Sequence, residues 1–232
     1  MKYQPSVNPI QASIMTTLCL HSTQRFSEMN STGVPSDQFS YHLRQLIKYN
    51  LVKKLPDSTY TLTVNGRSRA IMLDTRSNQF IEQGFIACRI VLSRVVDNET
   101  YYLVQHRTRV PYTGNIAEPG GKVLFGEDIL QAAHRNMLVE TGLSCDMKVK
   151  GLVHFKDQYQ GRIVQDKFFF VIRATNPKGE LLCRGATGEN VWMDQNQISN
   201  NPKTHKGVLD IIAIAEGRGQ EIRENTLTVD EY

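Results

Sequence analysis

The feature that most constrains the fold is a glycine-rich turn followed directly by one amphipathic helix, within residues 118–143. The Pro-Gly-Gly of residues 119–121 favours a tight turn, because glycine adopts backbone conformations that other residues avoid. After Glu127 the apolar residues recur with helical spacing, and Gly142 suits the left-handed conformation that often ends a helix. We therefore expect a helix that begins at Glu127 and buries Ile129, Leu130, Ala133, Met137 and Leu138.

The spacing of this segment matches a known signature. The Nudix signature is G-x5-E-x7-R-E-U-x-E-E-x-G-U, where U is an aliphatic residue. Seven positions of the chain are in register with it: Gly121, Glu127, Arg135, Met137, Glu140, Gly142 and Leu143. So many matches over one short segment are improbable by chance. Residues 83–215 therefore resemble the Nudix hydrolase superfamily.

The resemblance implies a chemistry for these residues. In the family, the glutamates of the signature hold one to three Mg²⁺ or Mn²⁺ ions, which neutralise a diphosphate and activate water. The arginine orients one of the glutamates. Carried over, the catalytic group comprises Glu140, Glu127 and Arg135, and the ligand is a nucleoside-diphosphate derivative. The glycines, Gly120 and Gly121, lie beside phosphate, and the Gly120 backbone also contacts the metal.

The chain departs from the signature at two of its three clustered glutamates. Asn136 and Val139 replace the first and second, and only Glu140 remains. Asn136 lies four residues before Glu140 on the same helix face, so its amide oxygen is a candidate metal ligand. Val139 offers no ligand. Because Mg²⁺ prefers carboxylates, we expect a weakened Mg²⁺ or Mn²⁺ site.

Four further charged residues are candidates for the same site. Glu118 and Glu189 are possible substitute acids, although a surface acid is the favoured interpretation of Glu118 and neither interpretation is favoured for Glu189. Arg107 and Arg109 precede the glycine turn. They are candidate phosphate ligands or members of a solvated loop.

The segments around the signature alternate between strand and helix. Apolar runs predict strands at residues 85–96, 100–107, 147–155, 167–174 and 191–193, and a closing helix at 207–215. This order predicts an α/β/α sandwich with a mixed sheet, in which 167–171 is a central strand because it is apolar on both faces. The polar residues 219–232 are expected to be a loosely ordered tail.

The first third of the chain has a different character and carries the excess positive charge. Residues 1–73 contain eight Lys and Arg against three Asp and Glu, a net charge of +5, whereas the whole chain has +4. Apolar periodicity predicts helices from residue 9, over 25–29, and from a cap at Ser36, the last with Phe39, Leu43, Leu46 and Ile47 inward. Residues 31–33 are expected to form a turn. Residues 51–55 and 59–62 predict a hairpin that turns at Pro56-Asp57.

This layout resembles a winged helix-turn-helix domain, a fold that binds DNA in many bacterial and archaeal regulators. In that family the third helix enters the major groove and the hairpin touches the backbone. The resemblance implies base contacts from Ser40, Tyr41 and Arg44, and phosphate contacts from Lys48, Lys53 and Lys54. The alternative is a module for dimerisation or protein docking, with the lysines on a solvated face.

The expected organisation is a winged helix over residues 1–75, a polar linker at 74–79, a Nudix domain over 80–218 and the tail. The four scattered cysteines are expected to be reduced and mostly buried. No apolar stretch is long enough for a membrane span or a secretory signal, so we expect a cytoplasmic protein, and a homodimer, with no membrane partner.

Three functions fit these features. The favoured one is a transcriptional regulator in which a nucleoside-diphosphate ligand alters DNA binding while hydrolysis is impaired or lost. The alternative is an active Mg²⁺-dependent pyrophosphohydrolase of nucleoside diphosphates linked to another group. A scaffold that has lost both ligand and DNA ranks last, because Gly120, Gly121, Glu127, Arg135 and Glu140 are retained together.

Overall fold

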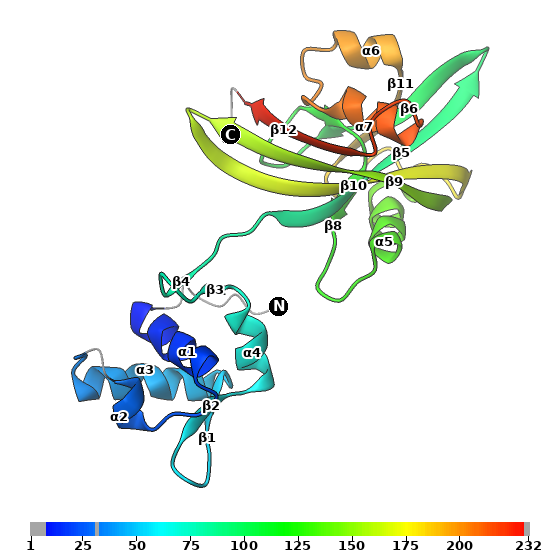
Figure 1. The fold of residues 1–232 in the computed structure, drawn as a ribbon. Coiled ribbons are helices and arrows are strands. Elements are labelled where there is room, and N and C mark those ends of the chain that lie inside the picture. The colour runs from blue at the N-terminus through cyan, green and yellow to red at the C-terminus, as the bar shows by residue number, and fades with distance from the viewer. Residues whose placement is uncertain (1–7, 31–32, 230–232) are drawn as a thin grey trace. The chain divides into compact units, whose positions relative to one another are not determined.

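The computed structural model describes residues 8–30 and 33–229, and the chain divides into two compact units, residues 1–83 and 84–232 (Figure 1). We call them the first and second units and consider each by itself. Among the described residues, no helix combines the length and the apolar character that a bilayer span requires.

The first unit packs three helices on a short hairpin. It contains α1 (Pro9–Leu20), α2 (Phe26–Met29), α3 (Ser36–Lys48), the antiparallel pair β1 (Val52–Lys54) and β2 (Tyr60–Leu62), and α4 (Val64–Ala70). Asn8 caps α1 by accepting a 2.9 Å hydrogen bond from the Ile10 backbone, and Pro9 starts the helix. One apolar core joins these elements and includes Ile14, Met29, Phe39, Leu43, Leu46 and Leu62.

Three details of the first unit differ from expectation. Ile47 is 39% exposed, so the buried stripe of α3 ends with Leu46. Ser36 is the first residue of α3 and follows Pro35, which provides no side-chain cap. The helix α4 was not expected; Thr63 begins it by accepting a hydrogen bond from the Gly66 backbone at 3.0 Å. The predicted turn at Ser31-Thr32 lies outside the described residues.

The polar segment 74–79 is not a linker. It forms the turn between β3 (Leu73–Asp74) and β4 (Gln79–Phe80), which pair antiparallel. Leu73 is buried in the core of the first unit and Phe80 packs against that core, which anchors both short strands there. The division between the units therefore falls at residues 83 and 84, later than the sequence indicated.

The second unit is built on a mixed sheet with the strand order β11-β6-β5-β10-β9-β12. The pairs β5·β10 and β9·β12 are parallel, and the other pairs are antiparallel. The strands are β5 (Phe85–Val96), β6 (Glu99–Arg107), β9 (Ser144–Tyr159), β10 (Arg162–Lys178), β11 (Gly188–Asp194) and β12 (Ile222–Thr228). The apolar run at 167–171 lies in β10, in the interior of the sheet, as predicted.

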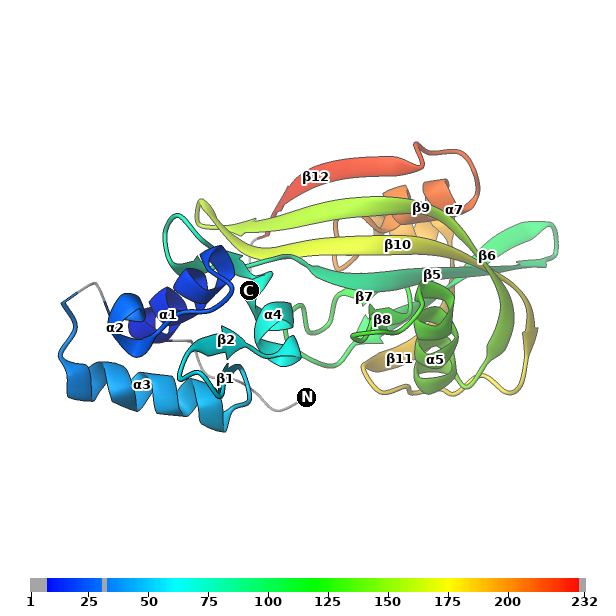
Figure 2. The ribbon, with the colours of Figure 1, turned by 60° about the horizontal axis from the view of Figure 1, so that its bottom comes forward.

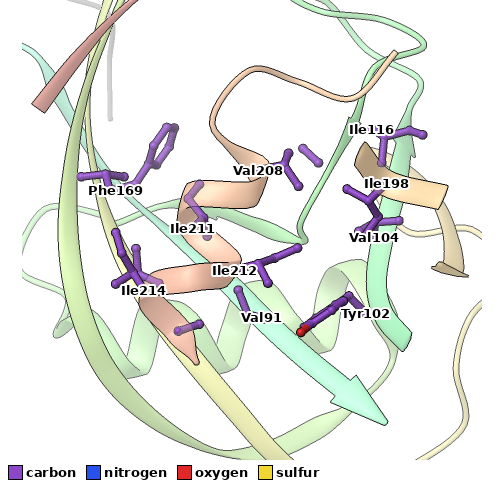
Figure 3. Close-up of a cluster of buried hydrophobic side chains, with 14 of the residues drawn as sticks. Val91, Tyr102, Val104, Ile116, Phe169, Ile198, Val208, Ile211, Ile212 and Ile214 are labelled. Carbon is purple, nitrogen blue, oxygen red and sulfur yellow. The ribbon is translucent and has the colours of Figure 1, made fainter. Parts of the chain in front are cut away.

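Helices cover both faces of this sheet, which gives the expected α/β/α sandwich (Figures 1 and 2). On one face, α5 (Ile129–Thr141) packs Ala133 and Met137 against Cys88, Ile90 and Ile172. On the other face, α7 (Val208–Ala215) and α6 (Gln195–Asn200) cover a second apolar core (Figure 3). That core contains Val91, Val104, Phe155, Phe169, Ile198, Ile211 and Ile212.

The helix α5 is rotated relative to the sequence prediction. It begins at Ile129 after the cap residue Asp128, and it ends at Gly142, whose φ of 75° is left-handed as expected. Leu130 is 39% and Leu138 56% exposed, so neither belongs to the buried side. The buried side instead includes two polar residues, Asn136 and Glu140, because this face of the helix turns towards the glycine-rich segment and a pocket.

The polar residues near the carboxyl end are ordered as a strand rather than a loose tail. β12 pairs in parallel with β9 between Ile222↔Leu152 and Thr228↔Gln158. Leu227 packs against the core, and Glu224 forms a 2.5 Å ion pair with Lys156. The strand is therefore held by pairing with a distant partner, and residues 230–232 lie outside the described part.

The cysteines divide evenly between two environments. Cys88 and Cys145 are buried as predicted, whereas Cys19 and Cys183 are exposed, so the expectation of mostly buried thiols is half right. Burial raises the pKa of the Cys88 thiol, and raises the pKa of Cys145 to about 11.

Candidate functional site

A pocket lies where two neighbouring strands of the sheet separate. β5 and β6 pair only between residues 93–96 and 99–102 and then diverge. The short strands β7 (Ile116–Ala117) and β8 (Gly120–Lys122) pair with β6 and β5 in the space between them. The resulting pocket has a volume of about 450 Å³ and is lined by residues from β5, β6, β8, β10 and α5.

The glycine turn forms one wall of the pocket, and its backbone lies too close to its neighbours for side chains. A Cβ atom on Gly120 would lie 2.1 Å from the backbone oxygen of Cys88, and one on Gly121 would lie 2.4 Å from Oδ1 of Asn136. Both glycines line the pocket. The Pro-Gly-Gly sequence is thus explained by close packing between β8, β5 and α5.

Glu140 of α5 reaches the pocket as a buried, hydrogen-bonded carboxylate. It is 4% exposed. Its Oε2 accepts hydrogen bonds from the Thr187 backbone and Thr187 hydroxyl, each at 3.0 Å, and from Nε2 of Gln105 at 3.3 Å. These three donors fix the orientation of the group.

The other polar residues of α5 form a structural network. Arg135 binds both carboxylate oxygens of Glu127, with two hydrogen bonds of 2.7 Å, and this pairing lowers the pKa of Glu127 to about 2. Arg135 also donates to Oδ1 of Asn136 at 3.1 Å. Glu127 accepts from the Leu124 backbone at 2.9 Å. The pair therefore ties the loop before α5 to the helix, and neither of its members lines the pocket.

Four of the side chains that line the pocket are basic. Arg89 of β5, Arg107 of β6, Lys122 of β8 and Lys167 of β10 line it, and Glu140 is the only acidic side chain among the lining residues described. Burial and the nearby Arg89 lower the pKa of Arg107. The guanidinium carbon of Arg89 lies 4.7 Å from the ring centroid of Phe169. Cations thus outnumber anions in this pocket.

One of these basic side chains, Lys167, belongs to a buried polar cluster. The Lys167 ammonium forms an ion pair with the fully buried Asp157, which also accepts a hydrogen bond from the Tyr112 hydroxyl. Burial lowers the pKa of Lys167 to about 8 despite this partner. His205, whose ring lies 5.2 Å from that of Tyr112, has a pKa lowered to about 3, by burial first and then by Lys167, Arg89 and Arg107. His205 is therefore neutral at pH 7.

Glu118 is not the surface acid that the sequence favoured. It is 2% exposed, and neither carboxylate oxygen has a hydrogen-bond partner among the described residues. Burial raises its pKa to about 7, although the charge of Arg89 acts in the opposite direction. The side chain is buried because the connection between β7 and β8 packs under Arg89, which donates to the Glu118 backbone oxygen at 3.1 Å.

Some of the predicted site residues line the pocket, and others lie outside it. Those that line it are Gly120, Gly121, Asn136, Glu140 and Arg107; those that do not are Glu127, Arg135, Glu189 and Arg109. Glu189 is 58% exposed in its side chain and lies 4.0 Å from Arg184, and Arg109 is exposed. Sequence reasoning missed Arg89, Lys122 and Lys167. The available signal was a single arginine within the otherwise apolar run FIACRIVL.

The residues predicted to contact DNA lie on one helix and one strand of the first unit. Tyr41, Arg44 and Lys48 are exposed on α3, and Ser40 is half-buried. Lys53 and Lys54 are exposed on β1, with the Lys54 ammonium 5.8 Å from the ring centroid of Tyr60. The buried side of α3, with Phe39, Leu43 and Leu46, is directed into the core.

Comparison with known proteins settles the family of the second unit. A family model of the NUDIX domain matches residues 88–213, more than half of the chain. The chain belongs to the Nudix family. This Nudix chain also resembles the NUDIX domain of Shewanella oneidensis NrtR complexed with ADP-ribose, at 15% identity and a TM-score of 0.52, over 66% of this chain and 97% of that one. The mutator MutT protein from Bacillus halodurans is 23% identical, with a TM-score of 0.49 over 64% and 93%.

Nudix hydrolases generally use Mg²⁺ or Mn²⁺, so the donor set of this chain has to be tested against such an ion. Among the residues described, no cluster of three or more His, Cys, Asp or Glu side chains is placed to hold a metal. Both oxygens of Glu127 are bound to Arg135, Oδ1 of Asn136 accepts from Arg135, and Oε2 of Glu140 already accepts three hydrogen bonds. A hard cation needs several free oxygen ligands. The residues present do not fit the family's metal.

Proposed function

We propose that this Nudix protein is a DNA-binding regulator whose second unit binds a nucleoside-diphosphate derivative as a signal and hydrolyses it slowly or not at all. The observation that carries the proposal is the charge of the pocket. Of the three clustered glutamates in the Nudix signature, this chain has one, Glu140, whereas four cationic side chains line the same cavity. Such a pocket favours an anionic ligand and is poorly suited to activating water through a metal.

The size and lining of the pocket fit part of a nucleotide. A volume of about 450 Å³ is within the range of small-molecule sites. Phe85 and Phe169 provide apolar surface beside the basic residues, and their rings lie 6.3 Å apart. ADP-ribose is the first ligand to test, because the NrtR domain with the same fold was solved in complex with it.

The first unit supplies the DNA-binding part of the proposal. Its helix α3 presents Tyr41 and Arg44 outward, opposite a fully buried face, and α3 is followed by a hairpin that exposes Lys53 and Lys54. This is the arrangement that a winged helix uses in the major groove and on the adjacent backbone. We propose that the protein binds a two-fold symmetric operator as a homodimer.

Binding of labelled duplex DNA from upstream of the protein's own gene tests the regulatory part. At low salt we expect binding by fluorescence anisotropy, and a change of about 5-fold to 150-fold in affinity on adding ADP-ribose, the usual range of allosteric coupling. Arg44→Ala should reduce the preference for specific over random DNA, whereas Arg162→Ala, an exposed arginine of the second unit, should not. Absence of binding to any duplex at low salt would contradict the proposal.

A hydrolysis assay separates the regulator from an enzyme. With Mg²⁺ or Mn²⁺ present, we expect no measurable turnover of ADP-ribose, nucleotide sugars or dinucleotides. Turnover that disappears in Glu140→Gln would show instead that the single remaining glutamate supports catalysis, and the chain would be a pyrophosphohydrolase. Sedimentation of the purified chain, with and without DNA, tests the proposed dimer.

A further inference from the structure

Among the described residues, no carboxylate forms an ion pair with either arginine of the pocket, although Glu140 is close enough to Arg107, and Glu118 to Arg89, for their charges to interact. Arg89 donates to the backbone oxygen of Glu118, at 3.1 Å, and Arg107 donates through Nε to the backbone oxygen of Pro111, at 3.3 Å. Other partly buried basic groups of the unit do have acidic partners; Lys167 has Asp157 and Arg173 has Glu216. Arg89 and Arg107 therefore keep unused hydrogen-bond donors beside the pocket.

These two guanidinium groups also repel each other. The charge of Arg89 is the largest electrostatic cause, after burial, that lowers the pKa of Arg107, and both residues line the same cavity. Holding two like charges in a partly desolvated site is unfavourable unless an anion joins them. A divalent cation placed there would add to the repulsion, whereas a diphosphate would remove it.

The usual metal ligands, by contrast, are directed into the protein. Arg135 donates hydrogen bonds to Glu127 and Asn136. Thr187 and Gln105 donate hydrogen bonds to Oε2 of Glu140. The side chains that would hold a metal are thus largely engaged in hydrogen bonds within the protein, whereas the guanidinium groups of Arg89 and Arg107 keep donors for a ligand. Arginine matches phosphate with paired hydrogen bonds, so these two side chains can neutralise a diphosphate directly.

We propose that Arg89 and Arg107 bind the diphosphate of the ligand in place of a divalent cation, so that ligand binding by this chain does not require metal. This inference rests on the proposed function, because it concerns the same pocket and ligand class. Lys122, which lines the pocket from β8, adds a third positive charge. Asn136 then serves to position the glycine turn, through the hydrogen bond that its Nδ2 donates to the Lys122 backbone oxygen at 3.4 Å, rather than to ligate an ion.

Calorimetry with the full chain tests metal independence. ADP-ribose is titrated into protein in excess EDTA and, separately, in Mg²⁺. We expect dissociation constants that agree within about twofold, since a required ion would change the affinity by orders of magnitude. Binding in Mg²⁺ alone would overturn this inference and leave the proposed function standing. Absence of binding in both media would overturn both. Mn²⁺ titrated alone should show no stoichiometric site; a tight one would count against the inference.

Substitutions test the assignment of the two arginines. Arg89→Gln and Arg107→Gln should each weaken ADP-ribose binding about 10-fold to 100-fold, the range for a lost charged hydrogen bond. Arg89→Lys should recover part of the loss. The matched control is Arg94→Gln, on the same strand, whose guanidinium also lies over an aromatic ring, 4.3 Å from that of Trp192, outside the pocket.

The control distinguishes a ligand contact from a packing role. If Arg89 only packs on Phe169, its glutamine variant should melt at a lower temperature while its affinity in EDTA stays unchanged. Unchanged affinity in both Arg89→Gln and Arg107→Gln would overturn the assignment. Should Arg89→Gln fail to fold, Arg107→Gln and Arg107→Lys, at the end of β6, decide the question by the same titration.

Discussion

The chain has two basic regions, and they differ in how far their charges are exposed to water. Arg44, Lys48, Lys53 and Lys54 of the first unit are exposed, whereas Arg89 and Arg107 of the second are partly buried. Exposed charges are screened by salt and attract any polyanion, and partly buried ones are screened less and require a ligand that fits. This difference in exposure fits the proposed roles, a long polymer on the first unit and one small molecule in the pocket of the second.

The largest expected effect comes from adding a side chain where the backbone around the pocket is closely packed. Gly120→Ala would place Cβ 2.1 Å from the Cys88 backbone oxygen, which a side-chain rotation cannot relieve. We expect it to destabilise the second unit by about 3 kcal/mol or more. Unfolding in urea, followed by the fluorescence of the single tryptophan, Trp192 in β11, reports this unit.

Gly161→Ala is the control for that substitution. Gly161 has a φ of 78° and no atom within 4 Å of an added Cβ. The cost should be limited to backbone strain, about 1 kcal/mol. Equal costs at the two positions would show that close packing does not define the pocket wall.

The response to salt should separate the two basic regions. If Lys48, Lys53 and Lys54 contact phosphates in both protomers of the proposed dimer, raising the salt concentration from about 50 to 200 mM should weaken DNA binding about a thousandfold. Binding of ADP-ribose in the pocket should weaken less than about tenfold, because its charges are partly shielded from the solvent. Anisotropy and calorimetry at matched salt measure both. Similar salt dependence for the two ligands would show that salt screens the charges of the two basic regions equally.

The response of the second unit to pH should combine two opposed contributions. His205, whose pKa in the folded chain is about 3, makes stability rise with pH up to about pH 6.5. The opposite contribution comes from Glu118. Its pKa in the folded chain is about 7, raised by burial from an ordinary value of 4.5, so the folded state binds the proton more tightly than the unfolded state. Stability is therefore greatest below pH 4.5 as far as this group is concerned, and falls as the pH rises to about 7. Glu118→Gln should remove this fall, worth at most about 3 kcal/mol. Denaturant unfolding at pH 5 and pH 8 measures it, and Glu189→Gln should keep the wild-type difference.

The smallest expected effect concerns one exposed lysine. Lys53→Ala should weaken DNA binding about threefold, equally for all sequences, and reduce the slope against log salt by about one. Lys148→Ala, exposed on β9 in the second unit, should do neither. A sequence-dependent loss in Lys53→Ala would assign this residue to base contacts instead.

The sequence predicted the parts of the fold that local pattern determines. The spacing from Gly121 to Leu143 identified the helix α5 and its left-handed end, and apolar runs located β5, β6, β9, β10 and β11. The helix α4 was missed although Thr63, a good capping residue, preceded it. Glycine has a low helix propensity, and only the structure shows why Gly66 is there: an added Cβ would lie 1.9 Å from the Leu51 backbone oxygen.

Features that depend on distant partners were not predictable in the same way. β12 has a polar sequence, and it is a strand because β9, some 70 residues earlier, offers an unpaired edge. Glu118 was interpreted as a surface acid because nothing next to it in sequence reveals the strand that buries it. Arg89 was passed over as part of an apolar strand, since its place beside Arg107 depends on the separation of β5 from β6.

The difference in burial among the thiols allows the two units to be labelled selectively. Cys19 lies exposed in α1 of the first unit and Cys183 lies exposed in the second, while Cys88 and Cys145 are buried. Partial burial also raises the pKa of Cys19, so its labelling should be slower than that of a fully solvated thiol. Maleimide dyes should therefore attach to one natural position in each unit without any engineered residue. Energy transfer between the two dyes would then test whether the distance between the units changes when the proposed nucleotide ligand is added.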